Sequence, residues 1–191
     1  MDKIILIILL LTTPRVLLPS WQQRPEHINI KVCQSERTKA NCNYKTMTVK
    51  SYLELVSNIA LSESKRGNFD VLLLLSIISN ESAFNPNVIG LRGEKGLCQI
   101  MPNGVASKHI IINKNKVIEK REGGVKLLIP EFNIKLCVNN LIECRNQCGN
   151  NPAKIAGCHN TGSCPAKDTQ YVKNFNNKYK LFKQYLGKVE G

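Results

Sequence analysis

The chain has 191 residues, of which 42% are hydrophobic and 21% are charged. This length suits one domain with a proper core and is too short for two, and the ordinary apolar fraction excludes an intrinsically disordered chain. The formal net charge of +13 predicts attraction to polyanions. Because the sequence has no basic stripe with interleaved aromatic residues, we expect no specific nucleic-acid partner; a solvated basic surface without any specific partner is the alternative.

The N-terminus has the pattern of an export signal. Lys3 precedes a short apolar run that ends at Pro14, and this run is too short for a comfortable membrane span. We predict a signal peptide over residues 1–20, with an uncleaved membrane anchor as the alternative. An N-terminal segment over residues 21–49 and a main domain over residues 50–188 follow. We therefore expect an exported protein, in the periplasm, the cell envelope or outside the cell, with the anionic cell envelope as its polyanionic partner.

Eight cysteines, an even number in a small chain with an apparent signal, predict disulfides. Residues 21–48 show no clear periodicity, and we expect an irregular segment there, tied together by Cys33 and Cys42. A zinc site is the competing use of the later cysteines, but their spacing matches no common zinc ribbon or finger. The residues concerned are Cys144, Cys148, Cys158, His159 and Cys164. We expect disulfides and no metal.

Two helices are predicted in the first half of the main domain. Residues 51–54, Ser-Tyr-Leu-Glu, form a capping-box pattern at the start of the first helix, and Gly67 is a reasonable stop. Asn68 or Asp70 can cap the second helix, which runs from residue 71 to about residue 80. The interior of the second helix is apolar on nearly every face, so we expect it to be buried on all sides.

Three further helices are predicted in the second half. One spans about residues 132–145, and another begins at Asn151 with Pro152 in its first turn. The last runs over residues 168–186, where apolar residues recur at helical spacing. Residues 105–122 are ambiguous between a short strand and a helix. The chain is thus predicted to be mainly α-helical.

Glu81 stands at the end of the apolar second helix. Poor solvation and the negative end of the helix dipole both disfavour a carboxylate there, so Glu81 is expected to keep its proton near neutral pH. An acid of this kind can protonate a leaving oxygen, which indicates glycoside cleavage. No other carboxylate has a comparably apolar sequence around it. A surface glutamate at a helix end is the alternative.

Four stretches, in order and near the expected spacing, resemble the catalytic domain of the soluble lytic transglycosylase family, relatives of goose-type lysozyme. The first contains Ile-Ile-Ser-Asn-Glu-Ser, the second Gly-Leu-Cys-Gln-Ile-Met-Pro, the third Pro-Glu-Phe-Asn-Ile, and the fourth Ala-Gly-Cys-His-Asn-Thr-Gly with a downstream Tyr-Val. They occupy residues 77–86, 93–102, 129–137, and 156–162 with Tyr171 and Val172. The resemblance covers about residues 52–186.

The resemblance implies a lysozyme-like fold. Together with the cysteine count and the pattern of residues 21–48, we expect a mainly α, lysozyme-like single domain with disulfides and an irregular N-terminal segment. The resemblance also implies an enzyme, a peptidoglycan lytic transglycosylase that cleaves the β-1,4 bond between MurNAc and GlcNAc and forms 1,6-anhydro-MurNAc. Glu81 would be the sole acid and base, because the sugar's own C6 hydroxyl replaces water and a second carboxylate is unnecessary. We expect glycan strands as the partner, no cofactor, and a monomer.

The same motifs suggest substrate-binding residues. Ser82 would orient Glu81 or an N-acetyl group, although a hydrogen bond within the helix end is equally expected. Gln99 and Asn160 offer amides for sugar recognition, and loop stabilisation is the alternative for each. Tyr171 matches a tyrosine that in the family reaches toward the catalytic glutamate, and a plain core position is its alternative.

The sequence departs from the family pattern at three positions. Cys98 replaces a methionine and Cys137 replaces a small residue, which suggests the hypothesis that these two cysteines are bonded to each other. His159 replaces a tyrosine, and an imidazole there would change sugar stacking or impose a pH dependence, with a tolerated variant as the alternative. Cys98 and His159 are included among the predicted substrate-binding residues.

Two other functions remain open on the sequence. A goose-type hydrolase that uses water would share nearly all of these residues. A non-catalytic protein of the same fold that binds or assembles at the cell wall is the second alternative, and the histidine at position 159 favours it.

Overall fold

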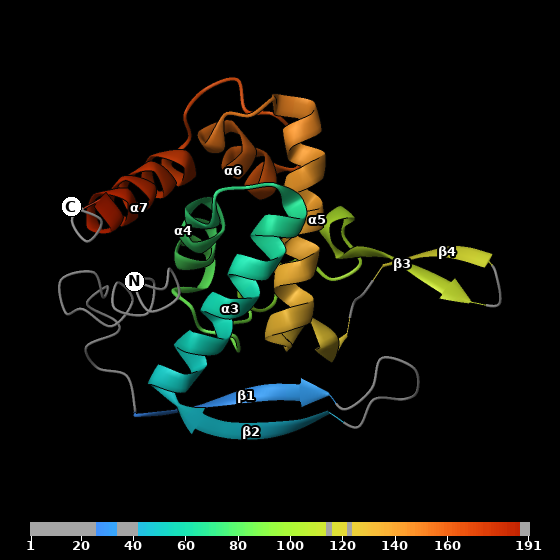
Figure 1. Ribbon diagram of the computed structural model, residues 1–191. Helices are drawn as coiled ribbons and strands as arrows, with labels where there is room; N and C mark the ends of the chain where they lie inside the picture. The colour runs from blue at the N-terminus through green and yellow to red at the C-terminus, as the bar shows by residue number, and fades with distance from the viewer. Residues whose placement is uncertain (1–25, 34–41, 114–115, 122–123, 188–191) are drawn as a thin grey trace.

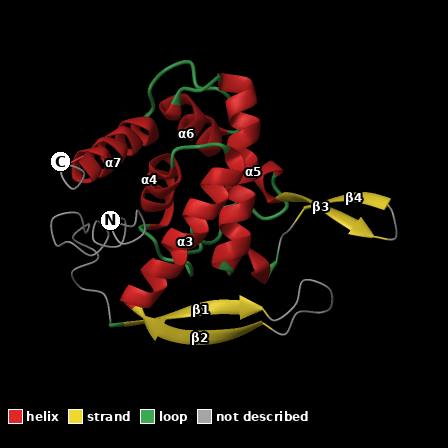
Figure 2. Cartoon of the chain, in the orientation of Figure 1, coloured by secondary structure: helices red, strands yellow, loops and turns green. Residues whose placement is uncertain are grey.

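The computed structural model describes residues 26–33, 42–113, 116–121 and 124–187. The predicted signal peptide, residues 1–20, lies outside these ranges. Five α-helices form the body of the described chain, and two separate hairpins flank it (Figures 1 and 2). The prediction of a mainly α fold is therefore confirmed. Within the described ranges, no helix combines the length and the hydrophobicity that crossing a bilayer requires.

Helix α3 (Val49–Gly67) begins earlier than the capping-box pattern predicts. Thr48, not Ser51, is the N-cap, because its side chain accepts a hydrogen bond from the Ser51 N–H. Gly67 ends the helix as predicted, and Asn68 follows in the left-handed conformation with a φ of 53°.

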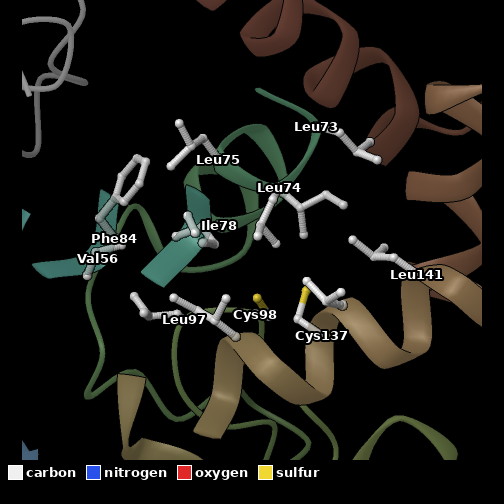
Figure 3. Packing of buried hydrophobic residues seen from close by; sticks show 14 of the residues in the cluster. Val56, Leu73, Leu74, Leu75, Ile78, Phe84, Leu97, Cys98, Cys137 and Leu141 are labelled. Carbon is white, nitrogen blue, oxygen red and sulfur yellow. The ribbon is translucent and has the colours of Figure 1, made fainter. Parts of the chain in front are cut away.

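Helix α4 (Val71–Ser82) is the central element of the body. Asp70 caps it by accepting a hydrogen bond from the Leu72 N–H at 2.9 Å. Its apolar side chains are buried on several faces, as the sequence predicts, and α3, α6 and α7 pack around it. Figure 3 shows Leu73, Leu74 and Ile78 of α4 within the core that Leu141 of α5 also lines. This burial fixes the end of α4, where Glu81 lies.

Three later helices complete the body. They are α5 (Pro130–Cys148), α6 (Pro152–Thr161) and α7 (Gln170–Gly187), and α5 packs on α3 and α6 while α7 packs on α4 and α6. Asn151 caps α6 by accepting hydrogen bonds from two backbone N–H groups, as its position before Pro152 predicts. The predicted starts of α5 and α7 each differ from the observed ones by two residues.

The N-terminal segment is a correction to the expected irregular structure. Strands β1 (His27–Cys33) and β2 (Cys42–Thr48) pair antiparallel, with His27 opposite Thr48 and Cys33 opposite Cys42. The physical reason is a period-two pattern in which apolar and polar residues alternate from Ile28 to Val32, with Ile30 buried against the core. The register is consistent with the predicted tie between Cys33 and Cys42, which stays a prediction.

The segment that the sequence left ambiguous between a strand and a helix, residues 105–122, contains the second hairpin. Strands β3 (Lys108–Asn113) and β4 (Lys116–Arg121) pair antiparallel between two short 3₁₀ helices, η1 (Val105–Ser107) and η2 (Val125–Leu128). Figure 1 shows this hairpin extending away from the helical body. The elements that pack most extensively on α4 are α3, α6 and α7.

Candidate active site

The chain reverses direction directly after Glu81. Helix α4 ends at Ser82 with Ala83 as its C-cap, and both Ala83 and Phe84 have positive φ angles, 47° and 61°. The hydroxyl of Tyr52 donates a hydrogen bond to the Phe84 carbonyl oxygen at 2.8 Å in the buried interior. Such backbone conformations are uncommon for residues with side chains, so the contact with Tyr52 helps to hold the turn that presents Glu81.

Two side chains from other helices meet the carboxyl group of Glu81. The Tyr171 hydroxyl, from α7, donates a hydrogen bond to Glu81 Oε1 at 2.6 Å. The ring of His159, from α6, places Nε2 at 3.8 Å from the same oxygen. The Glu81 side chain is 13% exposed and that of His159 is 4% exposed. The carboxyl group is therefore largely enclosed by protein but reachable from solvent.

Tyr171 acts toward Glu81 as a neutral donor. Burial raises the pKa of the Tyr171 phenol well above its ordinary value of 10, and the negative charge of Glu81 and the hydrogen bond to it raise it further. The phenol therefore keeps its proton and fixes one carboxyl oxygen of Glu81. The contact predicted by the family resemblance is present in the structure.

Lys178 lies on α7, the same helix as Tyr171, and it is a residue near Glu81 that the sequence did not reveal. Its ammonium group donates a hydrogen bond to the Ser79 carbonyl oxygen at 2.8 Å, two residues before Glu81. Burial lowers the pKa of Lys178, and the charge of Glu81 opposes that effect. The sequence signal for Lys178 is its position seven residues, or two helical turns, after Tyr171. This spacing places both residues on the same face of α7.

The segment between α4 and η1 is held by Asn133 of α5. The Asn133 amide donates to the carbonyl oxygens of Leu127 at 2.7 Å and Lys95 at 2.9 Å, and its oxygen accepts from the Cys98 N–H at 2.8 Å. Gly96 has a φ of 77°, and a Cβ there would meet Leu127 O and Asn133 Nδ2. The segment thus requires glycine at this position.

The amide and hydroxyl groups predicted to bind substrate have different surroundings. The Gln99 amide donates to the carbonyl oxygens of Val88 and Gly96, which is the loop-stabilising alternative. Ser82 is buried and bonds to the Ile78 carbonyl oxygen within α4. Asn160 is exposed beside His159 on α6. The structure brings the side chains of Glu81, Tyr171 and His159 together. Among the described residues, no hydrogen bond joins the side chains of Ser82, Gln99 or Asn160 to this group.

The hypothesis of a disulfide between Cys98 and Cys137 is wrong for this structure. Both are free thiols, fully buried and in contact with each other (Figure 3). The pKa of the Cys98 thiol is raised well above its ordinary value, first by burial and then by its hydrogen bond with Cys137, so the thiol form is favoured. The Cys98 side chain is enclosed, and only its backbone takes part in the site.

The later cysteines form disulfides, as expected. Cys144 is bonded to Cys158 and Cys148 to Cys164, so the zinc site considered as their competing use is removed. Within the described ranges there is no cluster of three or more histidine, cysteine or acidic side chains that suits a metal ion. The two disulfides fix α6 and the segment after it to the C-terminal end of α5.

The fold agrees with that of a solved enzyme. The chain is similar to an inactive glutamate-to-glutamine mutant of the lytic transglycosylase Slt from Pseudomonas aeruginosa, with a TM-score of 0.54 and 21% sequence identity. The likeness covers 68% of this chain and 24% of that chain, so the shared part is about a quarter of the larger protein. At this identity the comparison establishes a lysozyme-like fold. No curated protein matches the chain.

The family follows from the sequence match. Residues 58–182, more than half of the chain, match the family described as Transglycosylase SLT domain. The chain belongs to this family. The match includes Glu81, Tyr171, His159 and Lys178, the four residues around the end of α4.

Proposed function

We propose that the protein is a peptidoglycan lytic transglycosylase that cleaves the β-1,4 bond between MurNAc and GlcNAc with formation of 1,6-anhydro-MurNAc. The observation that carries the proposal is the enclosed carboxyl group of Glu81, 13% exposed at the end of α4 and held by the Tyr171 hydroxyl at 2.6 Å. Family membership supports the same activity. Ser82, Gln99 and Asn160 remain proposed substrate contacts, whereas Cys98 is not carried forward because its side chain is buried.

Glu81 performs both proton transfers in this mechanism. Its protonated form gives a proton to the glycosidic oxygen while the bond from that oxygen to C1 breaks and the ring gains oxocarbenium character. The C6 hydroxyl oxygen of the same sugar then bonds to C1, and the Glu81 carboxylate takes the hydroxyl proton. The products are 1,6-anhydro-MurNAc and a free C4 hydroxyl on GlcNAc, and Glu81 is protonated again without any water being consumed.

A second carboxylate is not needed for this reaction. Glu94, a candidate on the segment after α4, has both oxygens engaged by Arg92: Oε2 accepts from the backbone N–H at 3.0 Å and Oε1 from Nε at 2.8 Å. Backbone hydrogen bonding lowers the pKa of Glu94, with Arg92 contributing further, which suits an ion-paired structural carboxylate. This arrangement supports Glu81 as the sole acid and base.

Analysis of digested peptidoglycan by mass spectrometry tests the proposal. We expect anhydro-MurNAc ends from the wild type, and reducing MurNAc ends would establish hydrolysis instead. Glu81→Gln is expected to abolish cleavage while binding to sedimented peptidoglycan persists; the solved relative was likewise made inactive by a glutamate-to-glutamine change. Glu143→Gln, at an exposed position of α5, is the matched control and should cleave normally. Binding without cleavage by the wild type would favour the non-catalytic alternative.

We expect the protein to meet its substrate outside the cytoplasm. Peptidoglycan lies there, and the two disulfides suit an oxidising compartment. The formal charge of +13 would concentrate the protein at an anionic envelope. We propose that the protein is exported and acts as a monomer. Fractionation of producing cells, with the protein followed by immunoblot, tests the location.

A further inference from the structure

The His159 ring beside Glu81 has no task in a mechanism with a single acid. Its side chain is 4% exposed, so a sugar ring cannot stack on it where it lies. Nε2 lies 3.2 Å from the Cys98 carbonyl oxygen and 3.8 Å from Glu81 Oε1, while Nδ1 lies 3.3 Å from Asn140 Nδ2. Both ring nitrogens are thus engaged by protein groups at the position where a charge would act most directly on Glu81.

These partners determine where the ring carries its protons. A backbone carbonyl oxygen only accepts hydrogen bonds, so Nε2, which faces that of Cys98, carries a proton. The side-chain amide of Asn140 can act as donor or acceptor toward Nδ1. It presents its NH₂ group in one orientation and its oxygen after rotation by 180°. With its NH₂ toward Nδ1 the imidazole of His159 is neutral, and with its oxygen toward Nδ1 the ring is a cation. The Asn140 amide can therefore form a hydrogen bond with Nδ1 in either charge state of the ring.

The Cys144–Cys158 disulfide keeps this pair together. Asn140 lies one helical turn before Cys144 on α5, and His159 directly follows Cys158 on α6. The covalent link therefore joins the two helices at the level of the contact between Asn140 and His159.

We propose that His159 is a positioning residue that controls the charge of Glu81, and that Asn140 selects between its two charge states; this inference rests on the proposed lytic transglycosylase function. In the neutral state, with the Asn140 amide donating, His159 leaves Glu81 free to hold the proton that cleavage requires. When the ring gains a second proton, its positive charge favours the Glu81 carboxylate and the acid step stops. Imidazoles change charge in the range of about pH 5 to 8, so the change produces an acidic limit to activity.

The other titratable groups around the pair do not reproduce this effect. Tyr171 on α7 and Cys98 beside the ring are held in their neutral forms, because burial raises the pKa of each. Cys137 of α5 is a buried free thiol in contact with Cys98. Lys178 on α7 is the cation nearest to the end of α4 in the described contacts, and its hydrogen bond to Ser79 does not involve the imidazole.

Two substitutions and their combination test the proposal through the dependence of kcat and KM on pH. Asn140→Asp presents an acceptor to Nδ1 at all times and favours the cation, so we expect kcat at neutral pH to fall about tenfold with little change in KM. His159→Gln cannot gain a charge, so we expect its acidic limit to move to lower pH. In the double variant the loss caused by Asn140→Asp should disappear. The proposal would be overturned if Asn140→Asp lowered kcat equally in the wild type and in His159→Gln. An unchanged acidic limit in His159→Gln would also overturn it.

An NMR titration supplies a measurement that does not depend on activity. The ¹⁵N signals of the His159 ring should titrate at lower pH in Glu81→Gln than in the wild type, because the neutral amide no longer stabilises the imidazolium. Identical titrations would overturn the coupling of the two groups, even where Asn140→Asp fails to fold. If the wild type cleaves no peptidoglycan while the two titrations are coupled, the proposed function fails and the electrostatic link between His159 and Glu81 holds.

Discussion

The ammonium group of Lys178 lies 2.8 Å from the carbonyl oxygen of Ser79, at the same end of α4 that presents Glu81. The C-terminal end of a helix carries partial negative charge, and a cation there is stabilising. Lys178 thus offsets the charge of the helix end at the point where the proposed acid lies. Because burial lowers the pKa of Lys178, the folded protein binds this proton less tightly than the unfolded chain does.

Lys178→Met should change how stability depends on pH. The ordinary pKa of lysine is 10.5 and that of folded Lys178 is lower, so the unfolded chain holds more protons in the window below 10.5. The wild type gains stability as pH rises through that window, and the variant lacks this gain. Urea unfolding at a series of pH values measures the difference. Lys173→Met, at an exposed position of the same helix, is the control. If the stability of Lys178→Met differed from that of the wild type by the same amount at every pH, the expectation would be contradicted.

Tyr179→Phe is expected to lower stability at neutral pH but not at high pH. The Tyr179 hydroxyl donates to Asp70 Oδ2 at 2.9 Å, and burial, with a smaller effect of Asp70, raises the pKa of Tyr179 to about 12. The folded pKa lies above the ordinary value of 10, so the contribution is complete below pH 10 and is lost as pH rises toward 12. We expect a loss of about 1 kcal/mol in the free energy of unfolding at neutral pH.

The same unfolding measurement checks the prediction for Tyr179, with Tyr44→Phe as the control. Tyr44 is 59% exposed on β2 and should tolerate the change at every pH. A loss for Tyr179→Phe that persists unchanged to pH 12 would show that the hydrogen bond to Asp70 is not its cause.

Asn133→Leu should destabilise the segment that follows α4. The substitution removes three hydrogen bonds at once and leaves the Cys98 N–H and two carbonyl oxygens without this partner. We expect the free energy of unfolding to fall by about 3 kcal/mol. Asn133→Asp keeps an acceptor for Cys98 but places an oxygen against two carbonyl oxygens, so it should also destabilise. Thermal unfolding checks both variants, and Asn146→Leu, exposed on the same helix, should unfold like the wild type.

Cysteine labelling separates the two classes of cysteine. Cys98 and Cys137 are fully buried, so iodoacetamide should modify them only after unfolding. Peptide mapping without reductant should then recover Cys144 linked to Cys158 and Cys148 linked to Cys164. Modification of Cys98 in the native protein, or its recovery in a disulfide, would contradict the buried free thiols of Cys98 and Cys137.

The sequence predicts the elements whose signals are local. The continuous apolar pattern of α4, its Asp70 cap and the Asn151–Pro152 start of α6 all depend on neighbouring residues, and each is observed. The N-terminal hairpin was predictable in principle, because apolar residues alternate from Ile28 to Val32, yet the pattern spans only one short strand. The start of α3 shifted because Thr48 competes with Ser51 as a cap.

The candidate site was predicted only in part because its contacts join distant segments. Glu81 and Tyr171 were identified by motif, and the hydrogen bond between them spans 90 positions. Two departures from the family pattern suggested a bond between Cys98 and Cys137, and the structure shows two buried free thiols in contact. The roles of Lys178, Asn133 and Asn140 depend on which carbonyl oxygens and ring nitrogens tertiary packing brings to them, and no local pattern encodes that.

The outlying hairpin of β3 and β4 has a practical consequence for protein engineering. Its strands pair with each other and extend from the body, away from α4 (Figure 1). The elements that pack most extensively on α4 are α3, α6 and α7, and the strands of this hairpin are not among them. A reporter side chain introduced on β3 or β4 would therefore label the protein without altering the helices that position Glu81.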